Sequence, residues 1–369
     1  MATTFKTFLN DDVVSTKSLL HEFIPITGTI VTGTYVVGGV EKNIKNYGHG
    51  MFQSVYDYPY LSSSANHIFD ITVGLSPNLS SSANTQNAKK MQIYNQMAQV
   101  LAGNDVSGSI LKFDQDGNIV AGGTKHESVF FLNFSRLLTK DEIKKGSFTL
   151  AIGNGDGTEG AQNTSSLLTI SDYGAATEYR VNSPAGEYGI LYDNPTPTEG
   201  TGIGLIYYQA GVAVITSSVF NQAVLDSTKT GTDSVQQAFT GSTIETLSDS
   251  IRKRWGSCEF NNTTELNSTI YFCRANHNEF NYSGNPTYLS SSQIRVKNVE
   301  SDQPTTYITT VGLYSSDNEL LATAKLSEPL KKTPENEMIL RVRLDYWLSI
   351  NNKTNKLPIY FRQFCYLWL

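Results

Sequence analysis

The side chains that most often carry chemistry are scattered along this sequence. Five histidines are present, His21, His49, His67, His126 and His277, and no two have the spacing of zinc ligands on one helix or beside a cysteine pair. His277 lies four residues after Cys273, but a second ligand pair is missing. No Gly-x-Ser-x-Gly nucleophile elbow occurs, and no two carboxylates stand out as an acid and a base. The sequence therefore predicts no catalytic residue, no metal ligand and no enzyme.

One glycine motif has the spacing of a dinucleotide-binding loop. Gly155, Gly157 and Gly160 follow a predicted strand, as that loop requires. The loop must also open a helix, whereas the residues after Gly160 are typical of a loop and a strand. Asp156 and Glu159 would also repel a pyrophosphate. We therefore expect no nucleotide and no other cofactor.

The segment 114–118, DQDGN, resembles the start of a calcium loop. An EF-hand loop needs Gly at its sixth position and Glu at its twelfth. Here Gly117 stands at the fourth position and Lys125 at the twelfth. Because Asp-Gly is a strong signal for a tight turn, a hairpin turn is the better interpretation.

The charge of the chain does not favour a nucleic-acid partner. Lys and Arg number 28 and Asp and Glu number 34, so the formal net charge is 28 − 34 = −6. Binding to nucleic acid comes largely from phosphate neutralisation, and this chain has no overall attraction of that kind. The densest basic group, Arg252-Lys253-Arg254, is interpreted as a solvated basic turn.

Three cysteines, Cys258, Cys273 and Cys365, are too few for a disulfide framework. Cys258 and Cys273 are expected on neighbouring strands, where a bridge is conceivable, but two buried thiols in a reducing compartment are preferred. The start of the chain lacks a basic segment followed by an apolar stretch, and no apolar run reaches about 18 residues. We expect neither a secretion signal nor a membrane span.

The composition points to β structure and to contact between proteins. Charged residues make up 17% of the chain, below the quarter or so that is usual, and the sequence contains 20 Tyr and 17 Phe. Tyr, Thr and small polar residues suit pleated surfaces and turns. Tyr also buries much area in an interface while keeping a hydrogen-bonding tip.

The first half of the chain mixes strands with one strong helix. Residues 15–22 are expected to form a short helix or an extended arm, 26–40 two strands around a turn, and 67–75 a half-buried strand. Residues 86–102 predict a helix that Gly103 ends. Its apolar stripe is expected to pack on a sheet and consists of Met91, Tyr94, Met97, Ala98 and Leu101.

Shorter signals follow that helix. Thr139 and Glu142 have the spacing of a capping box, which predicts one helical turn after Thr139, closed by Gly146. A strand is expected over 147–153, and loops with short strands over 153–202. Residues 202–220 predict a hairpin that turns at Gly211, and 220–255 a helix between loops or an insertion.

The end of the chain alternates regularly. Five strand-like runs cover 268–275, 292–299, 307–315, 319–327 and 338–350, separated by polar turns. The arginines of these runs are expected either to be solvated on strand faces or to hold carboxylates across subunit contacts, and they are Arg274, Arg295, Arg341 and Arg343. Residues 357–369 are aromatic and apolar, so we expect them to be buried in this chain or in a neighbour.

These patterns predict a mainly β fold, antiparallel and resembling a β-sandwich or barrel, with one or two helices and α+β by strict count. Three domains are expected: 1–155, an N-terminal α+β domain; 156–267, a loop-rich β or insert region; and 268–369, a C-terminal antiparallel β module with a terminal arm.

Several segments of the chain resemble virion structural proteins of T-even-like tailed myophages, above all those that infect marine cyanobacteria. The resemblance rests on FCRANHNEFNYSGNPTY at 272–288, on 307–332 and LRVRLDY at 340–346, and on two N-terminal stretches at 5–30 and 51–74. It implies a structural component of the tail, baseplate or neck, assembled in the host cytoplasm, with other virion proteins and copies of itself as partners. It transfers no catalytic residue.

Three functions are therefore weighed. A structural subunit would form symmetric oligomers with large buried interfaces. A receptor- or glycan-binding virion protein, or a capsid-surface protein, would keep a free face with an exposed aromatic shelf. A depolymerase riding on the particle would have a cleft with two carboxylates at glycosidase separation. The first is favoured because the sequence contains no motif of a reactive site.

Overall fold

The computed structural model describes residues 5–32, 36–58, 66–79, 84–119, 122–154, 166–198, 200–220, 225, 234–281, 289–290, 293–294, 301, 303–315, 317–346 and 364–368. Its contacts form two compact units, which we describe separately. The central unit is Leu20–Thr264, and the terminal unit joins Met1–Leu19 to Glu265–Leu369. The three expected domains, 1–155, 156–267 and 268–369, stay a prediction.

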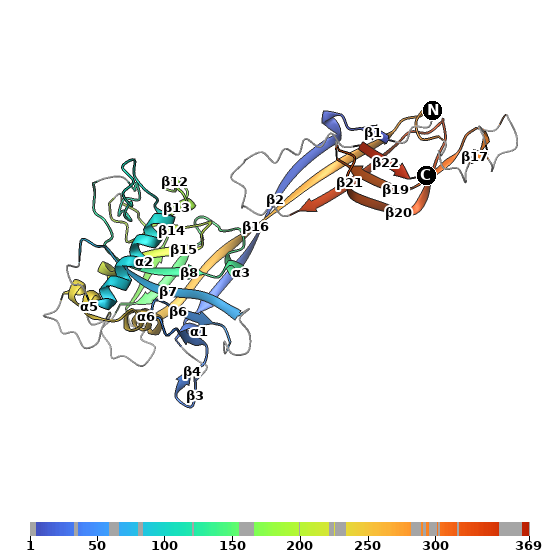
Figure 1. The fold of residues 1–369 in the computed structure, drawn as a ribbon. Helices are drawn as coiled ribbons and strands as arrows, with labels where there is room; N and C mark the ends of the chain where they lie inside the picture. The colour runs from blue at the N-terminus through green and yellow to red at the C-terminus, as the bar shows by residue number, and fades with distance from the viewer. Residues whose placement is uncertain are drawn as a thin grey trace. The chain divides into compact units, whose positions relative to one another are not determined.

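An eight-stranded antiparallel sheet organises the central unit (Figure 1). Its order is β12-β13-β14-β15-β8-β7-β6-β5. The bounds are β5 Ile44–Asn46, β6 Gln53–Tyr56, β7 His67–Leu75, β8 Ser128–Phe134, β12 Arg180–Ser183, β13 Gly186–Leu191, β14 Gly204–Tyr207 and β15 Val212–Thr216. Sequential strands are neighbours at most positions, although the connection from β7 to β8 contains α2.

A second sheet has the order β11-β10-β16-β2, and β9 and β21 also pair with β16. The bounds are β2 Val13–Thr27, β9 Glu142–Ile143, β10 Thr149–Gly153, β11 Leu167–Ser171, β16 Trp255–Ala275 and β21 Met338–Tyr346. Both β2 and β16 contribute residues to both units.

Opposite faces of β7 and β8 bury different partners. Phe69 lies opposite Phe134 in the ladder, so both side chains share one face, where Phe69 stacks on Trp255 of β16 at 4.7 Å between ring centroids. Phe131 points to the other face and packs edge-on against Phe113, which in turn contacts Tyr94 of α2. Because a strand alternates its side chains, the two aromatic clusters build a sheet-on-sheet layer and a helix layer.

Five described helices belong to the central unit: α1 Gly28–Val31, α2 Thr85–Leu101, α3 Arg136–Thr139, α5 Val235–Gly241 and α6 Ile244–Lys253, with a 3-10 turn η3 at Ser217–Val219. The long helix α2 is capped by Asn84, whose side chain accepts a hydrogen bond from the Asn87 amide at 2.7 Å. Figure 1 shows α2 against the eight-stranded sheet, as its apolar stripe predicted. Within the described residues, no helix is both long and apolar enough to cross a membrane.

The terminal unit contains a four-stranded sheet of order β1-β22-β19-β20, with bounds β1 Phe5–Thr7, β19 Thr306–Tyr314, β20 Leu320–Lys332 and β22 Phe364–Trp368. Its core joins this sheet to β16 and β21 through Tyr271, Ile308, Val311 and Leu313. Smaller elements are the 3-10 turn η1 Asn10–Asp12, the hairpin β17 Leu289–Ser290 with β18 Gln293–Ile294, and, in the central unit, the hairpin β3 Val36–Val37 with β4 Val40–Glu41.

The predicted fold class is confirmed: the described chain is mostly antiparallel β, sandwich-like, with few helices and no closed barrel. The helix over 86–102, the strand over 67–75 and the hairpin at Gly211 are also confirmed. The strand over 67–75 is buried on both faces, whereas a half-buried strand was expected. Residues 15–22 are extended within β2, and 220–255 contains the two helices α5 and α6.

Two predictions about short segments were wrong. Residues 28–31 form the helical turn α1 instead of a strand, because this turn buries Val31 completely. The capping box at Thr139 is also absent: Thr139 ends α3, whose N-cap is Ser135, and Ile143 then pairs with β16. Burial of Ile143 in the core favours the strand over a helix that would start at Thr139.

The C-terminal runs are partly described. The predicted strand over 268–275 is the end of the 21-residue β16, and 307–315, 319–327 and most of 338–350 lie in β19, β20 and β21. Only 293–294 of the run 292–299 belong to a described strand. Of 357–369, the backbone of 364–368 lies between β1 and β19, and the rest falls outside the described residues.

Replacing Gly211 by alanine is expected to lower the free energy of unfolding by about 2 kcal/mol. Gly211 turns the β14–β15 hairpin at a φ of +67°, and an added Cβ would lie 2.9 Å from Thr139 Cγ2. Gly200→Ala is the matched control, since its φ is +79° with no atom within 4 Å of an added Cβ. Urea denaturation should show a smaller loss for Gly200→Ala, and equal losses would contradict a role for the Thr139 contact.

Candidate functional site

The strand β2 is exposed along most of its length. Residues 14–23, ten in succession, are all exposed, so neither face of the strand is packed there. Four of them are apolar side chains, Val14, Leu19, Leu20 and Phe23, which are 42%, 51%, 55% and 58% exposed. β2 also stands at the end of its sheet in the described chain, which leaves its outer backbone groups without a neighbouring strand.

Side chains of β16 hold the inner edge of β2. In the central unit, the buried Asn262 accepts a hydrogen bond from the Glu22 amide at 3.1 Å, while its own Nδ2 donates to Leu138 O at 2.8 Å. In the terminal unit, Lys17 forms an ion pair with Glu265 at 2.5 Å. These contacts keep β2 extended although most of its side chains face solvent.

The other long edge strand, β20, is protected against strand addition. It contains Pro329, which lacks a backbone donor, and its register with β19 shifts between Ile308 and Thr310. Lys325 and Lys331 add charge along it. Proline, bulges and lysine are the usual means of blunting an edge, and residues 13–24 of β2 contain no proline and one lysine. The part of β2 before Pro25 is therefore the better candidate for a pairing edge.

A cavity of about 220 Å³ lies in the central unit beside the C-terminal part of β2. Apolar walls come from Ile24, Pro25 and Ile26 of β2, from α1, from β7 and from α3. The polar lining consists of Asp57, Asn66 and His67. No prediction from sequence brought these residues together, because they come from separate segments whose spacing forms no motif.

His67 is oriented by a carboxylate, yet the group is no catalytic triad. His67 Nε2 lies 2.8 Å from Asp70 Oδ1, and the same oxygen accepts a hydrogen bond from Ser54 Oγ at 2.5 Å. In a triad the serine hydroxyl bonds to the histidine, which here it does not. Ser54 is 2% exposed, so its hydroxyl is also not presented to a substrate.

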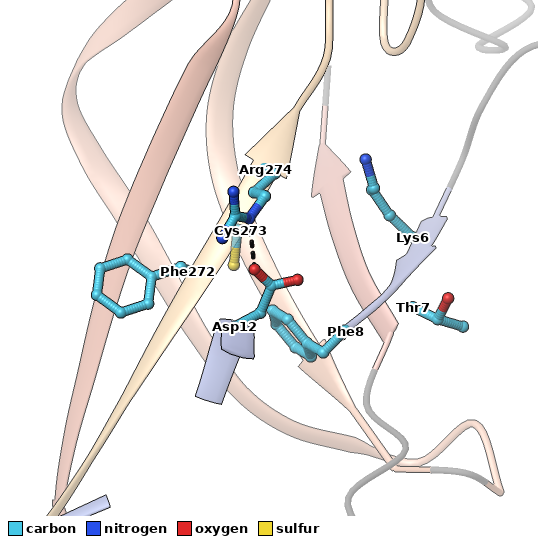
Figure 2. Close-up of a pocket in the computed structure, with 7 residues that line it drawn as sticks. All are labelled: Lys6, Thr7, Phe8, Asp12, Phe272, Cys273 and Arg274. Atoms are coloured by element: carbon cyan, nitrogen blue, oxygen red, sulfur yellow. Dashed lines mark hydrogen bonds and ion pairs between the residues drawn. The ribbon is translucent and has the colours of Figure 1, made fainter. Parts of the chain in front are cut away.

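A much smaller hollow occurs in the terminal unit. Figure 2 shows Asp12 and Arg274 pointing toward one another beside Cys273, with Arg274 Nε 2.5 Å from Asp12 Oδ1. The Leu9 amide donates to the other oxygen of Asp12 at 3.0 Å. The cavity measures about 10 Å³, which is room for roughly one water molecule. This arrangement ties η1 to β16 and has no space for a substrate.

The predicted arginines are distributed differently. Arg274 and Arg343 contact carboxylates of their own chain, Asp12 and Asp345, the latter at 2.7 Å. Arg341 lies exposed on β21, and Arg295 falls outside the described residues. Contacts of these arginines across subunits stay a prediction.

The acidic loop at 114–118 is a turn, as expected. The Gly117 amide donates to Asp114 O at 3.3 Å, and Lys125 forms an ion pair with Asp114. Asn118 contacts the Asp116 carboxylate at 2.7 Å. The glycine motif at 155–160 falls outside the described residues.

The histidines lie apart from one another. His126 is buried, and burial lowers its pKa to about 4. His49 stacks on Tyr47, and His277 lies beside Glu337. His21 contacts Asn262 and Thr263. In the part of the chain that the structure describes, no three His, Cys, Asp or Glu side chains are grouped to hold a metal ion.

One buried carboxylate has a structural role. Asp172 accepts hydrogen bonds from the amides of Gly146 and Phe148 at 2.7 and 3.1 Å and from the Tyr208 hydroxyl at 3.0 Å. Burial raises the pKa of Asp172 to about 6, although these donors lower it. The contacts fix the turn before β10 against β11, and the side chain is 1% exposed.

The structure also tests the predictions for the cysteines and for the basic run at 252–254. Cys258 and Cys273 are free, buried thiols, as preferred, and they lie on one strand, β16, instead of on neighbouring strands. The interpretation of Arg252-Lys253-Arg254 as a solvated turn was wrong, because Arg252 and Arg254 are 1% and 4% exposed. Arg252 forms ion pairs with Glu41 and Asp249, and these pairs offset the cost of burying its charge.

Comparisons with known proteins give no relative from which a function could be transferred. No family model matches the chain, and neither a curated protein nor a solved structure matches it.

Proposed function

We propose that this chain is a structural subunit of a tailed-phage virion, assembled in the host cytoplasm, and that a partner adds a strand to β2. The observation that carries the proposal is the run of ten exposed residues, 14–23, on the edge strand β2. Residues 13–24 of this strand contain no proline. Strand addition satisfies the free backbone groups of such an edge and buries its side chains.

The exposed apolar side chains of β2 suit an interface. Leu20 and Phe23 would remove apolar surface from water on opposite faces of β2, since residues three apart in a strand point to opposite sides. At about 25 cal/mol per Å² of buried apolar surface, two such side chains contribute a few kcal/mol to an interface. The partners are other virion proteins or further copies of this chain, and the proposal includes no enzymatic step.

The virion assignment is tested on purified particles of the phage that encodes the chain. Mass spectrometry is expected to find the chain, and electron microscopy to place it in a symmetric ring of the tail, baseplate or neck with a strand beside β2. A chain absent from the particle, or a purified monomer that hydrolyses glycans, would sink the proposal.

Charges placed on β2 are expected to block incorporation. The double substitution Leu20→Lys with Phe23→Lys should reduce the amount of chain in particles at least tenfold, because each exposed apolar side chain becomes a charge that the interface must desolvate. Leu330→Lys on the protected strand β20 is the matched control and should incorporate normally. Thermal melting should be unchanged in both variants, and normal incorporation of the β2 variant contradicts the proposed edge.

A further inference from the structure

The cavity beside β2 has the properties of a receptor for one side chain. We infer that it receives a lysine or arginine side chain carried by the strand that adds to β2, an inference that rests on the proposed function. Such a pocket would select the partner, while backbone pairing with β2 would supply binding that does not depend on sequence.

The size of the cavity limits its guest. Pockets for drug-sized ligands measure roughly 300–1,000 Å³. This cavity, at about 220 Å³, is smaller and suits a single long side chain better than a whole cofactor or sugar chain. Ile24 and Ile26 point to one face of β2, and Pro25 between them lacks a backbone donor, so an added strand would pair with β2 up to Ile24. The residue that follows the last pair on the added strand would then reach the cavity.

The walls of the cavity suit a methylene stem. Ile24, Ile26, Ile30, Ile68 and Leu138 surround it, and Leu137 stands at 59% exposure. Lysine and arginine bury their aliphatic stems against such surfaces while the charged end reaches a polar group. A short polar side chain would leave these walls uncovered.

The charge of the cavity selects a cation. Asp57 is its one carboxylate, and among the described residues that carboxylate makes no hydrogen bond or ion pair, although the Asp57 amide donates to Asn66 O at 2.9 Å. A second carboxylate, Asp70, stands behind His67 at 2.8 Å. None of the ten lining residues is Lys or Arg. An arginine or lysine would therefore meet a carboxylate of opposite charge, whereas a carboxylate side chain would be repelled.

The inference is tested with two labelled peptides that differ in one group. Fluorescein-labelled acetyl-Thr-Val-Thr-Arg-Thr-Val-Thr-amide is compared with the same peptide carrying citrulline, which has the shape of arginine without its charge. Fluorescence anisotropy with the full chain should show at least tenfold tighter binding of the arginine peptide. Asp57→Asn should remove this preference without changing the affinity for the citrulline peptide. Asp317→Asn, an exposed carboxylate of the terminal unit, is the control for net charge and should keep the preference.

The outcomes separate the pocket from the edge. Equal binding of both peptides to the wild-type chain overturns the inference, and so does a preference that survives Asp57→Asn. If both peptides bind equally and the Leu20→Lys, Phe23→Lys variant weakens both, strand addition holds and the cation pocket fails. If neither peptide binds, the pocket inference fails as well, and incorporation into particles still decides the proposed function independently.

Discussion

Replacing Arg252 by methionine is expected to destabilise the central unit by about 3 kcal/mol at neutral pH. Arg252 is 1% exposed, and its guanidinium donates to Val31 O at 3.2 Å, to Glu41 at 2.7 Å and to Asp249 at 3.0 Å. Methionine fills similar volume but removes the guanidinium donors from all three acceptors, of which Asp249 keeps a hydrogen bond from Gln53 at 2.8 Å. The expected loss is at the lower end of the usual range of roughly 3–5 kcal/mol, because Glu41 and Asp249 are near 30% exposed and regain water.

Urea denaturation at pH 7 measures this loss, and the neighbouring residue supplies the control. Lys253→Met changes a less buried charge in the same last turn of α6 and should cost no more than about 1 kcal/mol. Arg252→Lys keeps the charge but not the planar fork of donors, so its loss should fall between the two. Equal stabilities of Arg252→Met and Lys253→Met would show that the three contacts contribute nothing measurable.

Arg252 also illustrates what a local pattern leaves out. Three basic residues in a row predict a solvated turn, because burial of an unpaired charge is costly. The cost is offset here by Glu41, which lies 211 positions earlier in the chain and is brought close by the hairpin of β3 and β4. No local pattern in the sequence predicts this contact between Glu41 and Arg252.

Elements with a strong local period were predictable. The strand β7 alternates, α2 repeats its apolar residues three and four apart, and Gly211 turns β14 into β15, so each follows from neighbouring residues alone. The pairing of β1 with β22 joins Phe5 to Tyr366 and depends on loop closure across nearly the whole chain. The periodicity of apolar residues depends on near neighbours only, so it cannot predict pairing between residues so far apart in the chain.

The candidate surface escaped prediction for a related reason. Residues 15–22 leave helix and extended arm both open, because Leu19, Leu20 and Phe23 share one helical face but are too few to decide against a strand. In the structure both faces of β2 are exposed, so the sequence shows no single apolar face of a strand. Contact with β16 decides for the strand, since Asn262 and Glu265 supply its partners.

A large effect of pH on folding is expected at Lys90. This lysine of α2 is fully buried, and its ammonium donates to the carbonyls of Phe239 and Ser242 at 2.7 and 2.6 Å, where it caps the C-terminus of α5. Burial lowers the pKa of Lys90 from 10.5 to about 8. The folded chain therefore loses the proton at a lower pH than the unfolded chain, and stability from this group rises as pH increases from about 8 to about 10.5.

Comparing the free energy of unfolding of the wild-type chain with that of Lys90→Met isolates the rise in stability with pH. At pH 7 the variant should be less stable by about 2 kcal/mol, since two helix-end carbonyls lose their donor. A shift of 10.5 − 8 = 2.5 pKa units corresponds to about 3 kcal/mol, so the deficit of the variant should grow by up to that amount toward pH 10.5. Lys89→Met, which removes an exposed ammonium of the same helix, should differ from wild type by a constant amount over this range. A deficit of Lys90→Met that shrinks as pH rises would mean that the buried group stays charged, with the two carbonyls outweighing the cost of its desolvation.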